Sequence, residues 1–257
     1  MPEAAVPRPS ASVILVRDAP AGLETFMVRR HAQSRVAPSA FVFPGGTVRS
    51  DDALPVDFAP SLSARSDTPV PVEEARAFYV AAVRELFEEA GVLLVREEPG
   101  QLLGVDDSDV VLQERLAAAR LALQARELSL AQLLRERGWQ PAFDELVPFS
   151  HWVTPDMLSA RFDTRFFVAH MPPRQSALHC TIETSEGIWL RPADLLDGTY
   201  PVVYATAQHL RRLLPYASIA ELLEFAQHKP IKRVQPEVRD SGGGLTVWLP
   251  PHLADTW

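Results

Sequence analysis

The sequence is poor in cysteine and has no long apolar run. Its 257 residues include a single cysteine, Cys180, which excludes an intramolecular disulfide and indicates a reducing compartment. No 18 consecutive residues are apolar, and the N-terminal MPEAAVPRPS lacks the hydrophobic region of a signal peptide. The C-terminal ADTW matches no peroxisomal or retention signal. We therefore expect a cytoplasmic protein with no membrane partner, and Cys180 as a small core residue rather than a nucleophile.

The chain also lacks an excess of positive charge. Its 33 acidic and 25 basic residues give a net charge of -8, which disfavours a non-specific nucleic-acid or anionic-membrane surface. A phosphorylated ligand would then need local cations or a metal ion. With 47% hydrophobic and 23% charged residues, the composition is that of a globular protein long enough for one large domain with insertions.

Strand-like and helical segments alternate along the chain. Strand-like composition indicates strands over 10–18, 23–30, 40–46, 146–155, 161–172 and 186–192. Helical patterns cover 71–90, where Gly91 is the stop, and 202–214 and 218–228. Residues 1–9 are predicted to be flexible, and 47–71, rich in Pro, Asp and Ser, to form a long loop. Residues 106–138 predict two amphipathic helices, and 229–257 a C-terminal extension.

The stretch VRELFEEAG, residues 83–91, concentrates negative charge on one helical turn. Glu85, Glu88 and Glu89 fall at i, i+3 and i+4, a spacing at which each like-charge pair costs a few tenths of a kcal/mol. A solvated acidic face is the ordinary explanation. The neighbouring Arg84 offers another, in which the guanidinium holds one carboxylate and the others bind a hard cation such as Mg²⁺.

Two segments together resemble the signature of the Nudix hydrolases, G-x5-E-x7-R-E-U-x-E-E-x-G-U, where U is a bulky aliphatic residue. They are FPGG at 43–46 and RELFEEAGV at 84–92, and the second matches every fixed position. The first half of the signature is not matched at its usual spacing. Gly46 precedes Arg84 by 38 positions instead of 14, so this chain has 24 extra residues between them (38 − 14). Arg76 stands eight positions before Arg84, where the family has its first glutamate, and Glu73 or Glu74 is the expected substitute.

This interrupted signature is similar to that of the coenzyme A diphosphatase-like branch, which is related to mammalian Nudix motif nineteen. The similarity extends over 10–228. That branch carries R-[SA]-x3-R-x3-G-x3-FPGG, and Arg30 and Arg35 fall on its two arginines. His31 replaces the small residue and Ser39 the glycine, so the match is partial.

The resemblance implies a Nudix fold, a mixed β-sheet sandwiched between helices (α/β/α). It places the Nudix domain at 10–228, with a loop insertion at 47–71 and a helical insertion at 106–138. It also implies a Mg²⁺ or Mn²⁺ cofactor held by a catalytic set that includes an orienting arginine. The residues that match this set are Glu85, Glu88, Glu89 and Arg84, with the Gly46 carbonyl as a further metal ligand.

Two roles stay open in the sequence. The general base is either a motif glutamate or one from a late loop, for which Glu183 and Glu186 are the candidates, although solvated loop charge is their commoner role. Arg30 and Arg35 would grip the 3′-phosphate or the pyrophosphate of a substrate, because a guanidinium fork matches phosphate oxygens. Their alternative is as surface arginines at a strand edge.

The implied reaction is hydrolysis of a small-molecule, nucleoside diphosphate-linked substrate at its pyrophosphate. Coenzyme A or acyl-CoA, cleaved to 3′,5′-ADP and (acyl-)4′-phosphopantetheine, is the favoured substrate. ADP-ribose, NADH and dinucleoside polyphosphates are alternatives within the enzyme class. A non-catalytic, nucleotide-sensing Nudix-like module and a helical interaction scaffold with a solvated acidic face are alternatives outside it. No nucleic-acid partner is expected, and a homodimer is left open.

Overall fold

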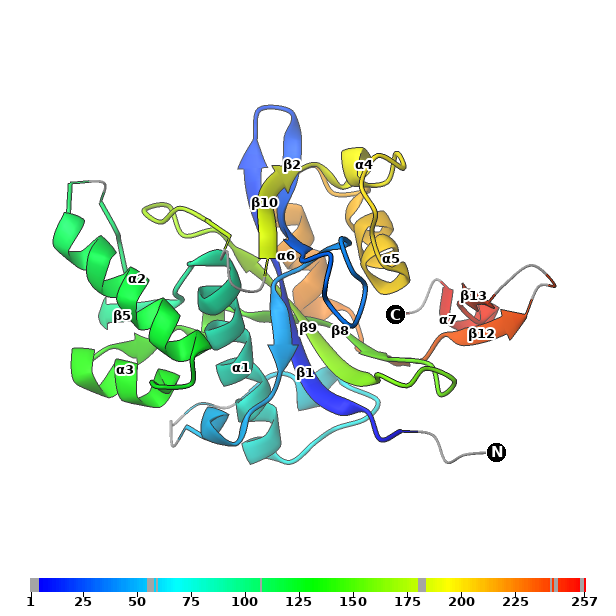
Figure 1. Cartoon of the computed structure of the whole chain (residues 1–257), viewed down its shortest axis with the longest axis horizontal. Coiled ribbons are helices and arrows are strands. Elements are labelled where there is room, and N and C mark those ends of the chain that lie inside the picture. The colour runs from blue at the N-terminus through cyan, green and yellow to red at the C-terminus, as the bar shows by residue number, and fades with distance from the viewer. Residues whose placement is uncertain are drawn as a thin grey trace.

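A computed structural model of the chain shows a central sheet with helices on both faces (Figure 1). It describes residues 5–54, 58, 60–106, 108–179, 184–240, 242, 245–254 and 257. Cys180 and Glu183 lie outside the described residues.

Within those residues, eight strands form the central sheet, in the order β10-β2-β1-β9-β8-β11, with β3 on β2 and β4 on β1. The strands are β1 (Arg8–Ala19), β2 (Gly22–Arg30), β3 (Phe41–Val42), β4 (Gly45–Thr47), β8 (Val147–Val153), β9 (Phe162–His170), β10 (Thr184–Leu190) and β11 (Arg233–Val234). β1 runs parallel to β9 and antiparallel to β2 and β4, so the sheet is mixed as predicted. The turn between β1 and β2 is short, and Gly22 takes a φ of 111° that favours glycine.

Helix α1 (Val72–Ala90) covers one face of this sheet. Fourteen of its 19 residues are buried, against β1 and β9 on one side and against the helical pair within residues 110–137 on the other. Gly91 ends the helix with a φ of 70°, the left-handed geometry of a glycine stop. The predicted helix and its terminator are thus confirmed, and its position places residues 84–89 beside the short strand β4.

The opposite face is covered by three helices. They are α4 (Pro192–Leu195), α5 (Tyr204–Leu213) and α6 (Ile219–His228). Ile14 and Val16 of β1 and Phe166 and Val168 of β9 face them in a second core. Since alternate residues of β1 and β9 belong to the two cores, the sheet is buried on both faces, which gives the predicted α/β/α layering.

The described parts of the segment predicted as a long loop, 47–71, contain two short 3-10 helices, η1 (Ser50–Asp52) and η2 (Ser63–Arg65). Arg65 fastens it to the sheet side by donating to the carbonyl oxygens of Ala226, Lys229 and Pro148. The first turn, η1, lies against α1. The segment therefore has defined contacts at both ends.

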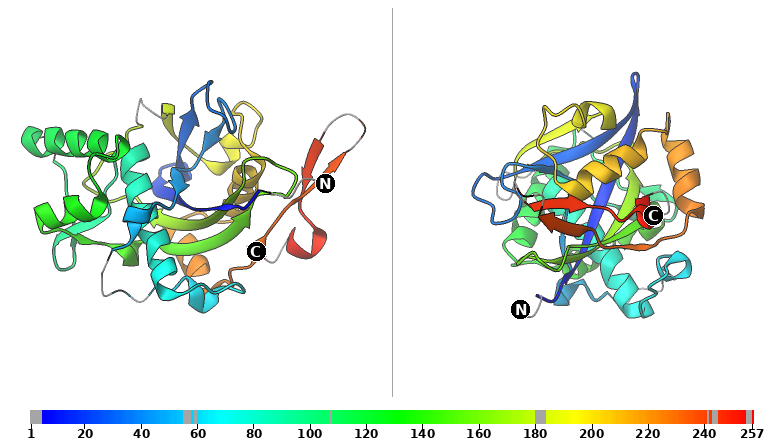
Figure 2. Two further views of the ribbon diagram at one scale, coloured as in Figure 1. Left: turned by 60° about the horizontal axis from the view of Figure 1, so that its bottom comes forward. Right: turned by 90° about the vertical axis from the view of Figure 1, so that its right-hand side faces the viewer.

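The predicted helical pair forms a hairpin at one end of the molecule (Figures 1 and 2). Its helices are α2 (Val110–Gln124) and α3 (Leu130–Arg137), and Ser129 caps α3 by accepting from the Gln132 amide at 3.1 Å. A small sheet accompanies the hairpin, made of β5 (Val95–Glu98), β6 (Gln101–Leu102) and β7 (Gln140–Pro141), with η3 (Phe143–Glu145) after it. At the opposite end lie the hairpin β12 (Glu237–Asp240) and β13 (Leu245–Trp248), and α7 (Pro251–Ala254). No helix in the described part of the chain is long and apolar enough to cross a membrane.

Candidate active site

The three carboxylates of α1 are buried. Glu85, Glu88 and Glu89 are only 4%, 0% and 4% exposed, although they lie on one turn of a helix. A solvated acidic face, the ordinary explanation for such a cluster, is therefore wrong. Buried carboxylates need paired charges or donors, and each of the three has a different set.

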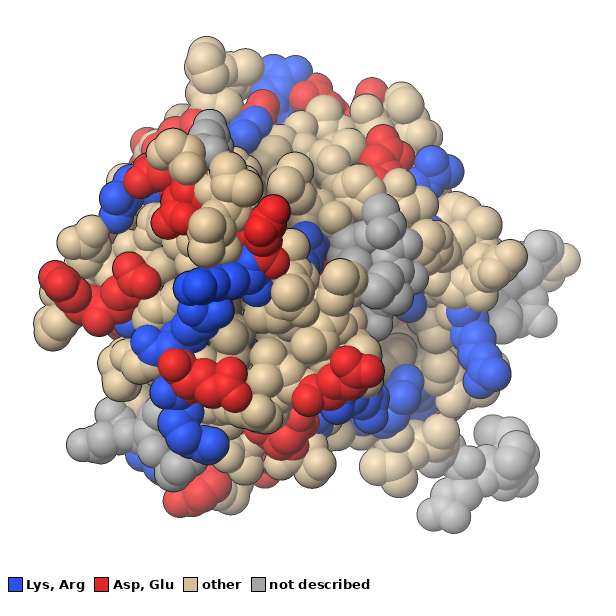
Figure 3. All heavy atoms as spheres, turned by 60° about the vertical axis from the view of Figure 1, so that its left-hand side comes forward, with Lys and Arg blue, Asp and Glu red and all other residues tan. Residues whose placement is uncertain are grey.

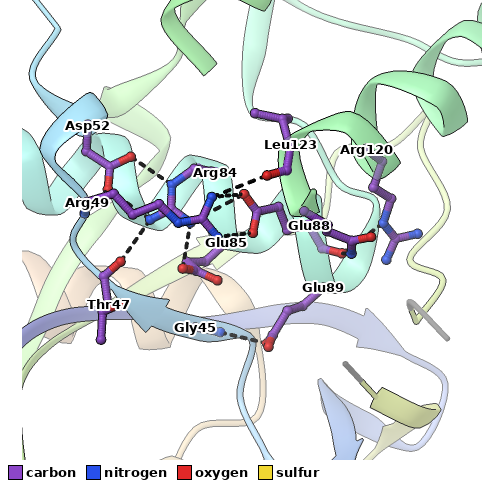
Figure 4. A network of polar contacts seen from close by, with 11 residues as sticks. Gly45, Thr47, Arg49, Asp52, Arg84, Glu85, Glu88, Glu89, Arg120 and Leu123 are labelled. Carbon is purple, nitrogen blue, oxygen red and sulfur yellow. Dashed lines mark hydrogen bonds and ion pairs between the residues drawn. The ribbon is translucent and has the colours of Figure 1, made fainter. Parts of the chain in front are cut away.

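Arg84 is the hub of the network (Figure 4). It is fully buried and donates from Nη1 to Glu85 Oε1 at 2.6 Å and to Glu88 Oε1 at 3.4 Å. From Nη2 it donates to the Thr47 carbonyl at 2.9 Å, which ties the helix to the end of β4. An arginine in this position fixes the orientation of Glu85, the geometry expected of an orienting residue.

The strongest partner of Arg84 is a residue that the sequence analysis missed. Asp52 accepts from Arg84 Nε at 2.7 Å and from Nη2 at 2.8 Å, and is 1% exposed. Glu73 and Glu74, the expected substitutes for the family's first glutamate, are exposed at the start of α1, so that expectation is wrong. Counting forward from the glycine finds the residue: Asp52 follows Gly46 by six positions, the G-x5-E spacing, with aspartate in place of glutamate. The 24 extra residues therefore follow Asp52 (84 − 52 = 32, against 8 in the signature).

Arg49 is the second residue that the sequence analysis missed. Its two terminal nitrogens each donate to one oxygen of Glu88 at 2.8 Å, a bidentate pair (Figure 4). Its Nη1 also lies 3.4 Å from the Leu123 carbonyl oxygen of α2. Arg49 belongs to the segment predicted as a loop, and nothing in its local sequence distinguishes it from a surface arginine. Its role depends on where the chain runs after the glycine corner.

The glycine corner approaches the same helical turn. The Gly45 amide donates to Glu89 Oε2 at 2.9 Å. A Cβ at Gly46 would lie 2.4–2.8 Å from the carboxylate atoms of Glu85, and a Cβ at Gly45 would lie 2.6 Å from the Ala11 carbonyl oxygen. At Gly45 the obstacle is backbone, so only glycine fits there; at Gly46 a Cβ would force the Glu85 carboxylate to move.

Burial and the neighbouring charges both shift the pKa values of Arg84 and Glu85. Burial by itself would lower the pKa of Arg84, but hydrogen bonds to Asp52 and the charges of Glu85, Asp52 and Glu88 outweigh it and raise the pKa above its usual value. Burial is the largest effect on Glu85 and raises its pKa, and Arg84 lowers it. The charge of Glu88 acts in the same direction as burial, and the resulting pKa is about 7.

A cavity of about 690 Å³ opens beside this network, within the size range of small-molecule sites. Glu85, Glu89 and the Gly45–Gly46 corner lie in its wall. From there it extends over the ends of β1, β9 and β8 to Trp152. Among the described residues, the charged side chains in its lining belong to five arginines and two glutamates: Arg8, Arg30, Arg35, Arg49, Arg126, Glu85 and Glu89. In a chain of net charge -8, this excess of cations favours an anionic ligand.

Both arginines of the predicted phosphate-binding pair, Arg30 and Arg35, are part of this cavity. Arg30 donates from Nε to the Val36 carbonyl at 2.9 Å, which shapes the loop between β2 and β3. Ser39, at the position where the branch signature has glycine, adopts a φ of 60°. That left-handed conformation favours glycine, so the structure explains the glycine of the signature and shows a serine accepting the same geometry.

Of the two candidates for a late-loop general base, the structure describes only Glu186. It lies on β10 with its side chain about half exposed and its carboxylate 3.5 Å from Arg29 Nη1, and it is not part of the cavity wall. Its position therefore disfavours Glu186 as the general base. Glu183 lies outside the described residues, so its role stays a prediction.

Only some of the acidic side chains at this site are available to bind a hard cation. Glu85 and Glu89 present carboxylate oxygens to the cavity beside Gly46, and oxygen ligands are those that Mg²⁺ and Mn²⁺ prefer. Glu88 instead has both oxygens bound by Arg49. Across the described ranges, no three acidic, histidine or cysteine side chains converge as a ready ligand cluster. The residues that fit a cation are thus Glu85, Glu89 and Gly46.

On the outer surface, acidic and basic side chains are interspersed over the face that carries the helical hairpin (Figure 3). The visible face has no broad patch of a single sign.

Comparison with known proteins matches this arrangement to a class of hydrolases. The sequence model of the NUDT19 Nudix domain matches residues 54–200, more than half of the chain. A crystal structure of a NUDIX hydrolase from Alicyclobacillus acidocaldarius superposes with a TM-score of 0.70 over 86% of this chain and 96% of that one, at 24% identity. The fold is therefore the Nudix fold, as predicted.

Among curated relatives, the acyl-coenzyme A diphosphatase NUDT19 of Xenopus laevis is 26% identical over 88% of this chain and 70% of its own length. The human acyl-coenzyme A diphosphatase NUDT19 is 27% identical over 95% of this chain and 72% of its own. The chain belongs to the NUDT19 Nudix domain family. It is a Nudix-type hydrolase that acts on pyrophosphate bonds.

Proposed function

We propose that this protein is a divalent cation-dependent coenzyme A diphosphatase. It would cleave coenzyme A or acyl-CoA to 3′,5′-ADP and (acyl-)4′-phosphopantetheine. The observation that carries the proposal is the cavity, whose wall contains two buried carboxylates beside a glycine corner together with five arginines. The acyl-coenzyme A diphosphatase activity named for the Xenopus and human relatives supports this choice of substrate.

The cation would be Mg²⁺ or Mn²⁺, held by Glu85, Glu89 and the Gly46 carbonyl, with Glu88 as a further ligand if Arg49 releases it. When bound, such an ion neutralises phosphoryl charge and lowers the pKa of a bound water. Arg84 keeps Glu85 oriented from behind, through the bond at 2.6 Å. The ligand set and these roles remain predictions.

The remaining chemistry belongs to the side chains of the cavity. The oxygen of a water forms a bond to one phosphorus while the bond from that phosphorus to the bridging oxygen breaks. The water proton passes to a motif glutamate, for which Glu85 and Glu89 are the candidates because both face the cavity. The bridging oxygen leaves on the second phosphate, and arginines such as Arg30 and Arg35 balance the charge of the separating phosphates.

A substrate panel tests the proposal. Purified protein with Mg²⁺ or Mn²⁺ is offered coenzyme A, an acyl-CoA, ADP-ribose, NADH and diadenosine polyphosphates, with products separated by chromatography. Turnover of coenzyme A that is lost in Glu89→Gln and on chelation, but kept in Glu186→Gln, is the expected result. Glu186→Gln is the matched control, because the Glu186 side chain is 44% exposed and lies outside the cavity wall.

The other outcomes are equally informative. If the protein hydrolyses ADP-ribose, NADH or a dinucleoside polyphosphate but not coenzyme A, the proposed substrate is wrong and the proposed enzyme class stands. These compounds are included because the arginine signature is only partly matched, with His31 and Ser39 at two of its positions. Tight nucleotide binding without turnover would support the sensor. Cytoplasmic location and a homodimer stay predictions, measured by cell fractionation and analytical ultracentrifugation.

A further inference from the structure

We infer that Arg126, supplied by the helical insertion, is a substrate-binding residue that holds the pyrophosphate group. The inference rests on the proposed function and adds to it a residue that no part of the Nudix signature contains. Arg126 lies two residues after the end of α2 and forms part of the wall of the cavity that contains Glu85 and Glu89.

The backbone of Arg126 is unusual. The Arg126 amide donates to the Leu123 carbonyl at 3.1 Å, and the Glu127 amide to the Ala122 carbonyl at 2.9 Å. These two bonds are those of a Schellman motif, whose left-handed residue is usually glycine. Arg126 occupies that position with a φ of 60°. An arginine is less favourable than a glycine here, because its Cβ crowds the backbone in the left-handed conformation.

At the ends of α1 and α3 the corresponding position is a glycine. Gly91 ends α1 with a φ of 70°, and Gly138 ends α3 with a φ of 69°. The end of α2 is therefore the exception among these three helices. A residue retained against its local backbone preference is most simply explained by its side chain.

That side chain has no structural partner in the described part of the chain. Its guanidinium makes no hydrogen bond and no ion pair there, in contrast to Arg49, Arg84 and Arg120. A cation that is exposed in an arginine-rich cavity and unpaired is available to an anionic ligand.

The anchorage of α2 places Arg126 at the carboxylate end of the cavity. Arg120 Nε and Gln124 Nε2 donate to the Glu88 carbonyl at 3.0 and 2.6 Å. Arg49, which binds the Glu88 carboxylate, also reaches the Leu123 carbonyl three residues before Arg126. The end of α2 is thus tied to the helical turn that bears Glu85 and Glu89. The proposed reaction cleaves the pyrophosphate at these carboxylates, so Arg126 is assigned to the pyrophosphate and not to the 3′-phosphate.

The test compares Arg126→Gly, Arg126→Ala and Arg126→Lys with Arg115→Ala, an exposed arginine of the same helix that lies outside the cavity wall. The expected result is a roughly 10- to 100-fold lower kcat/KM in the glycine and alanine variants, the range for losing charge-assisted phosphate bonds. The lysine variant should recover part of the activity, and Arg115→Ala should equal the wild type. Because glycine suits the helix end, the Tm of Arg126→Gly should be unchanged or higher.

Three outcomes would overturn the inference. If Arg126→Gly keeps the wild-type kcat/KM, the arginine has only a structural role. If the loss is confined to coenzyme A and absent for 3′-dephospho-coenzyme A, the pyrophosphate assignment is wrong. Should the wild type hydrolyse nothing in the panel, the proposed function fails on its own. In that case the affinity for inorganic pyrophosphate, measured by calorimetry, still tests the role of Arg126. Equal affinity in the wild type and Arg126→Gly would refute that role.

Discussion

Replacing Asp52 with alanine tests the organisation of the site most directly. Asp52 is 1% exposed and accepts three hydrogen bonds, two from Arg84 at 2.7 and 2.8 Å and one from the Arg49 amide at 2.7 Å. Its removal takes away the bidentate hydrogen-bond partner and one counter-charge of the buried Arg84 guanidinium. Breaking a buried ion pair in this way costs about 3–5 kcal/mol.

That cost is a large share of the total, since domains unfold with a free energy of about 5–15 kcal/mol. For a chain of this length it corresponds to a fall in Tm of about 6–20 °C. Activity should fall as well, because an Arg84 released from Asp52 no longer orients Glu85. The assay is urea unfolding at pH 7 with the Tm measured by calorimetry, beside the hydrolysis rate.

Asp51→Ala is the matched control, since Asp51 is the exposed neighbour and should change stability by no more than about 0.5 kcal/mol. A double-mutant cycle with Arg84→Met isolates the pair, and the double variant should be more stable than the sum of the two single changes predicts. Asp52→Glu, which carries the residue of the signature, should retain part of the activity. If Asp52→Ala lowers the Tm no more than Asp51→Ala does, the reasoning about Arg84 is refuted.

Three further predictions follow from the structure. Gly46→Ala should lower kcat/KM by about 100-fold with little change in Tm, because its Cβ would lie 2.4–2.8 Å from the Glu85 carboxylate and displace it. Arg49→Ala should lower the free energy of unfolding by about 1.5–3 kcal/mol, measured by urea titration, because it removes the bidentate partner of the buried Glu88. Burial lowers the pKa of His209 from 6.5 to about 3, so this side chain binds fewer protons in the native than in the unfolded state. The free energy of unfolding should therefore fall as the pH decreases from 6.5 towards 3. In His209→Gln the urea midpoint should fall less over the same pH range.

Each of these has its own control. The far-UV spectrum of Gly46→Ala should match the wild type, and full activity in this variant would show that the close approach is not needed. Arg115→Ala serves as the surface arginine for Arg49→Ala, and equal stability of the two would contradict the pairing. For the pH series the control is His228→Gln, because the His228 side chain is 72% exposed; an identical acid limb in all three proteins would exclude His209 as its origin.

The local part of the site was predictable from the sequence. The arrangement of Arg84, Glu85, Glu88 and Glu89 on one turn, ended by Gly91, follows from helical periodicity and a glycine stop, which depend on neighbours within a few residues. The strands β1 and β2 and the hairpin of α2 and α3 were predictable for the same reason. The glycine corner, with Arg30 and Arg35 before it, was found through its resemblance to a known signature.

The pairing of these side chains was decided by the tertiary structure. Asp52 meets Arg84 across 32 positions, and Arg49 meets Glu88 across 39, because a long insertion separates residues that the fold returns to one place. Spacing along the chain says nothing about such pairs once an insertion interrupts the signature. Arg126 was hidden for a related reason: its composition is that of a surface helix, and only the left-handed turn at the end of α2 and the anchorage of that helix on Glu88 place it in the cavity. Helical turns are determined by local sequence, whereas the partners of a buried charge depend on which distant segments exclude water around it.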